Sequence, residues 1–187
     1  MTREGILEAA ARIFSEKGFD AASMQDIADA VNLQKASLYY HFSSKQEILL
    51  SLLDHALDLL IERLEIVLSQ PLPPDEKLRQ AMSSYMQTIA ENQNLSAVLL
   101  LEIRALDPEL KARHAFRRDK FERLWRDLIA EGKQEGVFNS ADPSLAGRAL
   151  LGVMNWTVTW YRKDGPRSAS EIADQFTNLL LQGLLVR

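Results

Sequence analysis

A run of seventeen residues, from 30 to 46, carries two lysines, a histidine and two adjacent tyrosines but no aspartate or glutamate. The whole chain has 26 acidic and 22 basic residues, a formal net charge of -4, so this run differs from its surroundings. Lysine, glutamine, serine and tyrosine side chains can hydrogen-bond base edges or phosphate oxygens, and a neighbouring carboxylate would weaken each such contact. The pattern therefore favours local contact with a nucleic acid, although the global charge argues against indiscriminate coating.

A second group of basic side chains lies between residues 111 and 126, where seven Lys and Arg accompany two acids. At helical spacing, one face of this segment begins basic and turns apolar. Such a face suits an amphipathic ligand with an anionic head, and an acyl-coenzyme A has that shape. The alternative is a solvated charged face whose arginine stems cover an apolar stripe. The expected ligand contacts, some from an earlier apolar helix, are Tyr85, Met86, Ile89, His114, Arg117, Arg118, Phe121 and Trp125.

Composition sets the broad class of the protein. With 187 residues, 47% of them hydrophobic, the chain can bury one good-sized core or one small and one larger domain. The absence of cysteine excludes disulfides and thiolate metal sites. No signal peptide is recognisable, and the longest uncharged apolar stretch, residues 149–161, is well short of the roughly 20 residues needed to span a bilayer. We expect a soluble, cytoplasmic protein with no membrane partner.

Catalytic signatures are not found in the sequence. His41, His55 and His114 are scattered along the chain, and neither a glycine-rich phosphate loop nor a Ser-His-Asp or H-E-x-x-H spacing occurs. The sequence therefore predicts no enzyme, no cofactor and no metal site.

Helical spacing and capping residues organise the first part of the chain. Apolar residues predict a helix over residues 2–17 that Gly18 ends, and Ser23 with Asp26 resembles a capping box that starts a short helix. Asn32 tolerates the left-handed conformation of a tight turn, after which a third helix covers residues 35–41 with Leu38 and Phe42 buried. Two short helices joined by so tight a turn form a helix-turn-helix.

The rest of the chain also has helical periodicity. A second capping box, Ser44 to Glu47, predicts a long helix to residue 68, and prolines at 71, 73 and 74 interrupt the chain. No segment alternates with a period of two, so we expect an all-α fold of about nine helices. The expected domains are 1–47, which binds DNA, and 48–187, which binds ligand and dimerises. The remaining helices are predicted over residues 75–91, 95–106, 108–135, 143–162 and 168–185.

In a helix-turn-helix, the start of the second helix reaches base edges in the major groove. The expected base-reading residues are Gln34, Lys35, Ala36 and Ser37. The expected backbone contacts are Tyr39, Tyr40, His41 and Lys45. The alternative is a run that lacks acids by chance, with core tyrosines and an ordinary surface histidine.

The stretch ILEAAARIFSEKGFDAASMQDIADAVNLQKASLYYHFSSKQEILLSLL, residues 6 to 53, resembles the DNA-binding domain of the TetR/AcrR family of transcriptional regulators. The shared pattern runs along AAARLF, KGF, the IA pair, LYYHF and SK. The resemblance implies a homodimer whose three N-terminal helices bind DNA and whose larger domain binds a small ligand that releases the DNA. It also assigns the base-reading and backbone-contacting roles to the same residues as above. Asn32 replaces a usual glycine, and Gln34 stands where a capping serine or threonine is common, which bears on operator preference.

The C-terminal part carries a weaker resemblance. NWTVTWYRKDGP, residues 155 to 166, is loosely similar to acyl-CoA-responsive members of the family. The last two helices are apolar around too much of their circumference for one buried face, which favours a two-fold four-helix interface over an intrachain core. The expected interface residues are Trp156, Trp160, Phe176 and Leu180.

These observations predict a ligand-responsive repressor that an amphipathic effector, such as an acyl-CoA, releases from a palindromic operator. One alternative is a regulator of the same fold that senses a neutral hydrophobic or aromatic compound. Another is a helical ligand-binding protein that does not bind DNA. The helix over residues 45–68 is the expected moving link.

Overall fold

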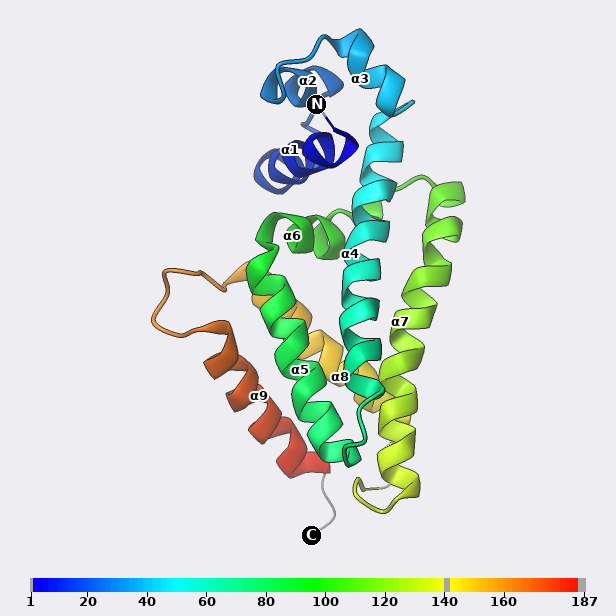
Figure 1. The fold of residues 1–187 in the computed structure, drawn as a ribbon, viewed down its shortest axis with the longest axis vertical. Helices are drawn as coiled ribbons and strands as arrows, with labels where there is room; N and C mark the ends of the chain where they lie inside the picture. The colour runs from blue at the N-terminus through cyan, green and yellow to red at the C-terminus, as the bar shows by residue number, and fades with distance from the viewer. Residues whose placement is uncertain (1, 140–141, 185–187) are drawn as a thin grey trace. The chain divides into compact units, whose positions relative to one another are not determined.

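The computed structural model describes residues 2–139 and 142–184, and this part of the chain contains nine α-helices, two short 3-10 helices and no strand (Figure 1). The predicted all-α fold is therefore confirmed. In chain order the elements are α1 Arg3–Lys17, α2 Met24–Ala30, α3 Lys35–His41, α4 Lys45–Leu68, α5 Pro74–Glu91, α6 Gln93–Leu101, η1 Ile103–Ala105, α7 Pro108–Gln134, α8 Pro143–Asn155, η2 Trp156–Thr159 and α9 Ala169–Leu184.

Local capping fixes the ends of the first helices. Gly18, with φ 79°, ends α1, and Ser23 forms a reciprocal capping box with Asp26 at the start of α2. Asn32 has φ 53°, so it adopts the left-handed conformation that the sequence predicts for the turn between α2 and α3. Leu38 and Phe42 are fully buried, also as predicted.

Two predicted helix details differ in the structure, and a third cannot be compared. The Ser44 hydroxyl accepts from the Glu47 amide at 3.1 Å, but the Glu47 carboxylate accepts from the amide and hydroxyl of Ser43 instead of closing a box with Ser44. The predicted helix 95–106 begins earlier and is interrupted at Glu102, whose carboxylate accepts the amide of Phe19 at 3.2 Å. The predicted end of the last helix, residue 185, lies outside the described residues.

The helix predicted over residues 143–162 is shorter than expected, because α8 ends at Asn155 and the 3-10 helix η2 follows. Two threonine hydroxyls bond back to carbonyls in this segment. Thr157 donates to the Met154 carbonyl at 2.6 Å and Thr159 to the Trp156 carbonyl at 2.7 Å. Such bonds give the backbone an alternative to the regular helical ladder.

The chain divides into two compact units. Residues 1–57 and 92–117 form the first, and residues 58–91 and 118–187 form the second. Both α4 and α7 continue from one unit into the other. The functional division expected at residue 47 stays a prediction.

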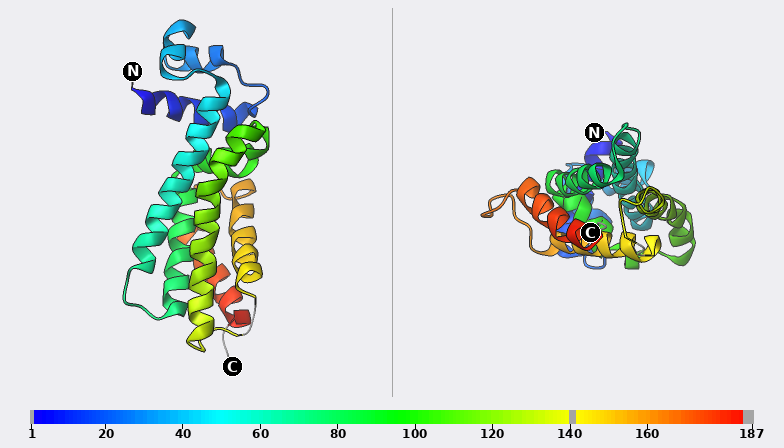
Figure 2. Two further views of the ribbon diagram at one scale, coloured as in Figure 1. Left: turned by 90° about the vertical axis from the view of Figure 1, so that its right-hand side faces the viewer. Right: turned by 90° about the horizontal axis from the view of Figure 1, so that it is seen from below.

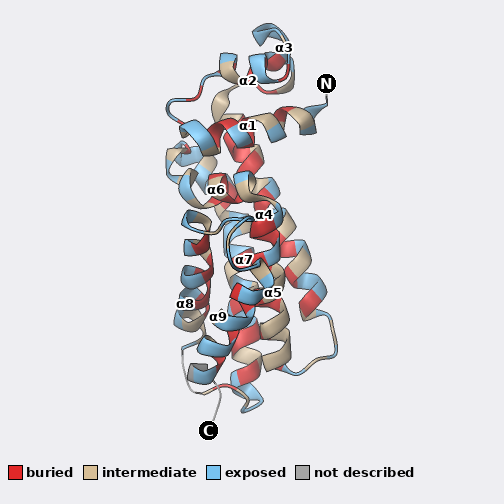
Figure 3. Cartoon of the chain, turned by 90° about the vertical axis from the view of Figure 1, so that its left-hand side faces the viewer, coloured by how far each residue is buried: buried red, intermediate tan, exposed pale blue. Residues whose placement is uncertain are grey.

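In the first unit, the three N-terminal helices bury apolar residues such as Phe14, Ile27 and Leu38, and buried residues are red in Figure 3. Within it α1 packs against α6, where the Ser15 hydroxyl donates to the Asn94 side-chain oxygen at 3.0 Å. The Gln46 side chain donates to the Ala105 carbonyl and accepts from the Asp107 amide, at 2.8 and 3.1 Å. These bonds hold the first turn of α4 to the segment that leads into α7.

In the second unit α5 and α9 lie side by side (Figures 1 and 2). Met82 and Tyr85 of α5 are buried, and the Thr177 hydroxyl of α9 contacts the Met82 sulfur at 3.6 Å. Lys77 of α5 pairs with Glu131 of α7 at 2.7 Å. No described helix combines the length and apolar character required to cross a membrane.

Candidate functional site

The exposed surface of α3 carries the residues expected to contact DNA. Because Leu38 points into the core, the side chains at the start of the helix face solvent. Tyr40 has 88% of its surface exposed and Tyr39 46%, which contradicts a core role for this aromatic pair. At the start of α3 all four expected base-reading residues are exposed: Gln34, Lys35, Ala36 and Ser37.

His41 is half-buried at the end of α3, and its ring meets the Tyr40 ring edge-on at 5.5 Å between centroids. The Gln34 side chain makes no capping bond to α3, so it is not tied to the helix start. That freedom is compatible with the base contact expected of it.

The acidic residues next to this surface are bonded to their own neighbours. Asp26 accepts from Lys17 at 2.7 Å and from Ser23, and these bonds hold the pKa of Asp26 well below its usual range. Hydrogen bonds from the Ser43 hydroxyl and amide likewise lower the pKa of Glu47. Asp29 accepts from the Gln25 amide at 2.7 Å. Each carboxylate thus has a local hydrogen-bond donor, and the Lys17 ammonium also offsets the charge of Asp26.

Lys45 has a local role that the sequence did not indicate. Its ammonium donates to the carbonyls of Phe19 and Ala22 at 2.7 and 2.6 Å and lies 4.2 Å from the centre of the Phe19 ring. It therefore braces the loop between α1 and α2. Its contact with phosphate stays a prediction, as do the other assigned DNA contacts.

His114 and Arg117, both expected to bind ligand, share the carboxylate of Asp54 in the first unit. The His114 ring is 1% exposed, and its Nδ1 lies 2.8 Å from Asp54 Oδ1. Arg117 Nη1 lies 3.0 Å from Asp54 Oδ2. The pair therefore connects α7 to α4 within this unit.

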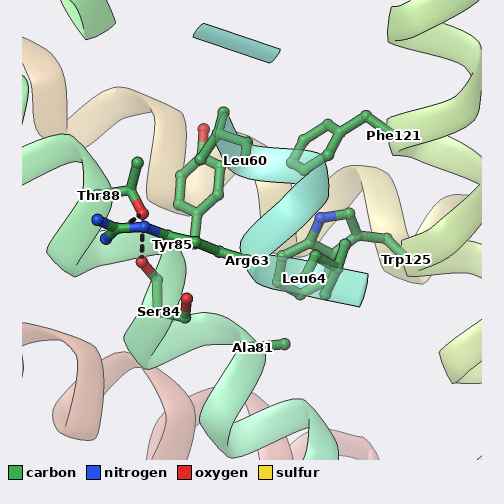
Figure 4. Close-up of a pocket in the computed structure, with 9 residues that line it drawn as sticks. All are labelled: Leu60, Arg63, Leu64, Ala81, Ser84, Tyr85, Thr88, Phe121 and Trp125. Atoms are coloured by element: carbon green, nitrogen blue, oxygen red, sulfur yellow. Dashed lines mark hydrogen bonds between the residues drawn. The ribbon is translucent and has the colours of Figure 1, made fainter. Parts of the chain in front are cut away.

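In the second unit, side chains of α4, α5 and α7 surround a small cavity (Figure 4). The centre of a water molecule can occupy about 10 Å³ of it, so the cavity has room for about one water. The cavity is lined by Leu60, Arg63, Leu64, Ala81, Ser84, Tyr85, Thr88, Phe121 and Trp125.

Three aromatic rings form one side of this cavity. Tyr85 stacks on Phe121 with centroids 6.1 Å apart, and Trp125 meets both rings edge-on, at 6.2 and 6.3 Å. The Tyr85 hydroxyl donates to Asn155, and burial raises the pKa of Tyr85 far above its usual value. The phenol is therefore neutral and already hydrogen-bonded.

The opposite side of the cavity is polar. Arg63 donates to the Thr88 hydroxyl at 2.9 Å and to the Glu91 carboxylate at 2.7 Å, while the Thr88 hydroxyl donates to the Ser84 carbonyl. The sequence analysis missed Arg63. The sequence feature that could have indicated Arg63 is its place as a lone cation within the apolar stripe of α4, between Leu60 and Leu64.

The residues expected to bind ligand are thus only partly brought together. Tyr85, Phe121 and Trp125 line one cavity, whereas Met86 and Ile89 are buried but do not line it. Arg118 pairs with Asp119 at 3.0 Å and lies 3.9 Å from Glu122. Within the described residues, no group of three or more His, Asp or Glu could hold a metal ion. The ligand assignments stay predictions.

The expected dimer residues lie on η2, directly after it and on α9, in the second unit. Trp156 is 69% exposed and Trp160 46%, and Trp160 contacts the Phe176 ring at 6.3 Å between centroids. Phe176 and Leu180 are half-buried. The neighbouring Val153 and Leu179 are exposed as well. This surface is apolar, and its pairing with a second copy stays a prediction.

Comparisons with known proteins place this geometry in context. Residues 6–52 match the family described as bacterial regulatory proteins, tetR family, and residues 71–184 match the tetracyclin repressor-like C-terminal domain. The HTH-type transcriptional repressor KstR2 of Mycobacterium tuberculosis is 30% identical over 184 residues, which cover 97% of this chain and 92% of KstR2.

Two solved structures are similar along nearly the whole chain. The TetR family regulator PfmR from Thermus thermophilus has a TM-score of 0.89 and 41% identity, and the match covers 97% of this chain and 99% of PfmR. AibR in complex with isovaleryl coenzyme A and operator DNA has a TM-score of 0.89 and 28% identity, covering 96% of this chain and 97% of AibR.

Proposed function

Since the chain belongs to the TetR family of bacterial transcriptional regulators, we propose that it is a homodimeric repressor that leaves a palindromic operator when it binds an acyl-CoA. The observation that carries the DNA-binding part is the exposed, acid-free surface of α3, on which Tyr40 is 88% exposed. An exposed aromatic side chain without a structural role in its own unit suits contact with a partner.

The proposed contacts follow from the chemistry of each side chain. Gln34 and Lys35 can hydrogen-bond purine edges, and Ser37 can bond either kind of base. Tyr39, Tyr40 and His41 meet phosphate oxygens and set the register of the helix on the duplex. Two copies of α3 in a two-fold dimer require two half-sites related by the same symmetry, hence a palindromic operator.

Selection from a pool of random duplexes tests the DNA-binding part. We expect a palindrome to be enriched by the wild-type protein and its affinity to fall by about 10-fold or more in Tyr40→Ala. Phe116→Ala is the matched control, since Phe116 is a similarly exposed aromatic residue, 78%, away from α3 in the same unit. Equal losses in the two variants, or no enriched sequence, would contradict the proposed surface.

The cavity of the second unit supports the effector part. Its aromatic and aliphatic side suits an acyl chain, and Arg63, partly exposed on the polar side, suits an anionic group. AibR is a similar protein whose structure contains isovaleryl coenzyme A together with operator DNA. The cavity has room for about one water, so an acyl chain enters as its lining side chains separate.

Calorimetric titration with butyryl-, octanoyl- and palmitoyl-CoA tests the effector class. We expect saturable binding of at least one chain length, and weaker binding to Arg63→Met, which keeps most of the side-chain length but loses its charge. The control is Arg79→Met, a partly exposed arginine of α5 that does not line the cavity. Binding of neutral hydrophobic compounds alone would favour the alternative effector class instead.

A further inference from the structure

Two buried side-chain atoms in the described part of the chain have no hydrogen-bond partner, Nε2 of His114 and Nε1 of Trp125. The second of these belongs to a cavity-lining residue that is 1% exposed. We propose that the Trp125 N–H is the donor that recognises the effector, by binding the carbonyl oxygen of its thioester. This assignment rests on the proposed function and names the atom that selects the ligand.

Apart from the half-buried Ser84 hydroxyl, the other polar side chains of the cavity already have partners. The Tyr85 hydroxyl donates to Asn155, the Arg63 guanidinium donates to Thr88 and Glu91, and the Thr88 hydroxyl donates to the Ser84 carbonyl. Figure 4 shows the Trp125 nitrogen on the edge of its ring that faces the middle of the lining residues, below Phe121. In the described lining, the Trp125 N–H is the fully buried donor that gains a partner from a ligand without breaking an existing bond.

The aromatic neighbours do not replace such a partner. Trp125 meets Tyr85 and Phe121 at interplanar angles of 81° and 80°, a geometry that allows an N–H to point at a ring face, but such a contact is much weaker than a hydrogen bond to an oxygen. Indole is a donor and never an acceptor. A buried donor in apolar surroundings is destabilising until an acceptor reaches it, which makes this position selective for a ligand that carries one.

The chemistry of the ligand follows from the position of the donor. The donor lies among aromatic and aliphatic side chains, where an acyl chain would be placed, and Arg63 lies on the polar side of the cavity (Figure 4). In an acyl-CoA, the acceptor directly attached to the apolar chain is the thioester carbonyl. A thioether of the same length has the same chain and the same coenzyme A but lacks this oxygen. The site should therefore distinguish the two compounds.

The experiment compares the dissociation constants of octanoyl-CoA and of S-octyl-coenzyme A, its thioether, for wild type and Trp125→Phe. For the wild type we expect octanoyl-CoA to bind about 10-fold more tightly than the thioether. For Trp125→Phe, which keeps an aromatic ring but removes the N–H, the ratio should fall to about 1. Tyr161→Phe is the matched control: it removes a hydroxyl from a half-buried side chain that does not line the cavity, so the ratio should stay near the wild-type value.

Three results would overturn the proposal. An equal affinity of the wild type for ester and thioether, or a ratio that survives in Trp125→Phe, refutes the role of Trp125 while leaving the effector class intact. Failure of the wild type to bind octanoyl-CoA refutes the proposed effector and this assignment together. If Trp125→Phe does not fold, replacing Trp125 with 3-benzothienylalanine removes the N–H with nearly the same ring shape, and the same change of ratio is required.

Discussion

At the scale of single residues, the buried pair of His114 and Asp54 shows how one hydrogen bond fixes a tautomer. An ionised carboxylate only accepts hydrogen bonds, so the Nδ1 of His114, 2.8 Å from Asp54 Oδ1, must carry the proton. In the neutral ring Nε2 is then the acceptor, and it is the atom left without a partner. The pair contributes to the first unit by joining α4 to α7.

We predict that His114→Ala lowers the free energy of unfolding by about 2–4 kcal/mol, because it leaves a buried cavity and removes one partner of Asp54. Urea unfolding monitored by circular dichroism measures the change. His55→Ala is the control: His55 is exposed, and its loss should change stability by less than about 0.5 kcal/mol. Similar values for the two variants would show that the Asp54 contact does not support the fold.

The hydrogen bonds of Asp26 predict that the stability of the fold decreases at acid pH. Its bonds to Lys17 and Ser23 hold the pKa of the folded state below that of the unfolded state, so its contribution is present above the unfolded pKa, about 4, and is lost as the pH falls through the folded pKa. Asp26→Asn should therefore lose less stability than the wild type between about pH 5 and about pH 2. Thermal melts across this range test it.

The control for this acid sensitivity is Asp20→Asn. Asp20 is exposed, and its side chain makes no hydrogen bond or ion pair with another described residue. Its melting temperature should follow pH as the wild type does. Parallel curves for wild type and Asp26→Asn would contradict the assigned role of Asp26.

Residue roles could be predicted from sequence where local chemistry decides them. Asn32 follows from the conformational preference of its own side chain, and the burial of Leu38 and Phe42 follows from helical spacing. The structural contacts of Lys45 and Arg63 could not be predicted. Lys45 bonds to carbonyls of a distant loop, and Arg63 bonds to a residue on another helix. Spacing along one helix does not specify such contacts.

At the scale of elements, the end of α7 depends on a close approach between a glycine and a ring. A Cβ atom on Gly132 would lie 2.2 Å from the Phe138 ring, which is buried over it, and Gly136 with φ 73° turns the chain between them. We predict that Gly132→Ala destabilises the protein by about 1–3 kcal/mol, because Phe138 must move. Denaturant unfolding measures the effect.

The double variant with Phe138→Ala isolates this contact. Once the ring is absent, the added methyl group should cost little, so the two substitutions should show a coupling of at least about 1 kcal/mol. Strictly additive changes would mean that the cost of Gly132→Ala does not come from its contact with Phe138.

Helix boundaries were predictable where a strong stop signal exists. Gly18, the prolines at 71, 73 and 74, and Gly136 each end or interrupt a helix where expected. The end of α8 at Asn155 was not predictable, since the apolar spacing continues to Tyr161 while threonine hydroxyls compete for the backbone carbonyls. Periodicity detects an amphipathic face but not this local competition.

At the scale of the whole molecule, the continuity of two helices offers a route between ligand and DNA. Leu60, Arg63 and Leu64 line the cavity from α4, and Phe121 and Trp125 line it from α7. The same two helices carry Asp54 and His114 in the first unit. We expect effector binding to favour the conformation that binds DNA less well, because a ligand without such a preference shifts nothing.

Assembly gives a second prediction at this scale. Trp156→Glu, which places a charge on the exposed apolar surface of η2, should convert the proposed dimer to a monomer in sedimentation equilibrium. Ile66→Glu is the control, because Ile66 is also exposed, 57%, but lies on α4. If Trp156→Glu remains dimeric, this surface is not the interface; a monomeric wild type would remove the basis for a palindromic operator.

The family and the architecture could be predicted from sequence alone, because the N-terminal motif and the helix signals are local. The cavity of the second unit could be predicted only in its aromatic residues, since three helices from different parts of the chain create it. Helical spacing predicts one face for His114, Arg117 and Phe121. In the structure Phe121 lines the cavity, and His114 and Arg117 contact Asp54 in the first unit.

The most direct test of the central claim is the affinity of the protein for its selected operator with and without saturating octanoyl-CoA, measured by fluorescence anisotropy. We predict that the ligand weakens operator binding by about 10-fold or more, and that the operator weakens ligand binding by the same factor. Operator affinity unchanged by a ligand that demonstrably binds would contradict the account, because the two sites would then be uncoupled.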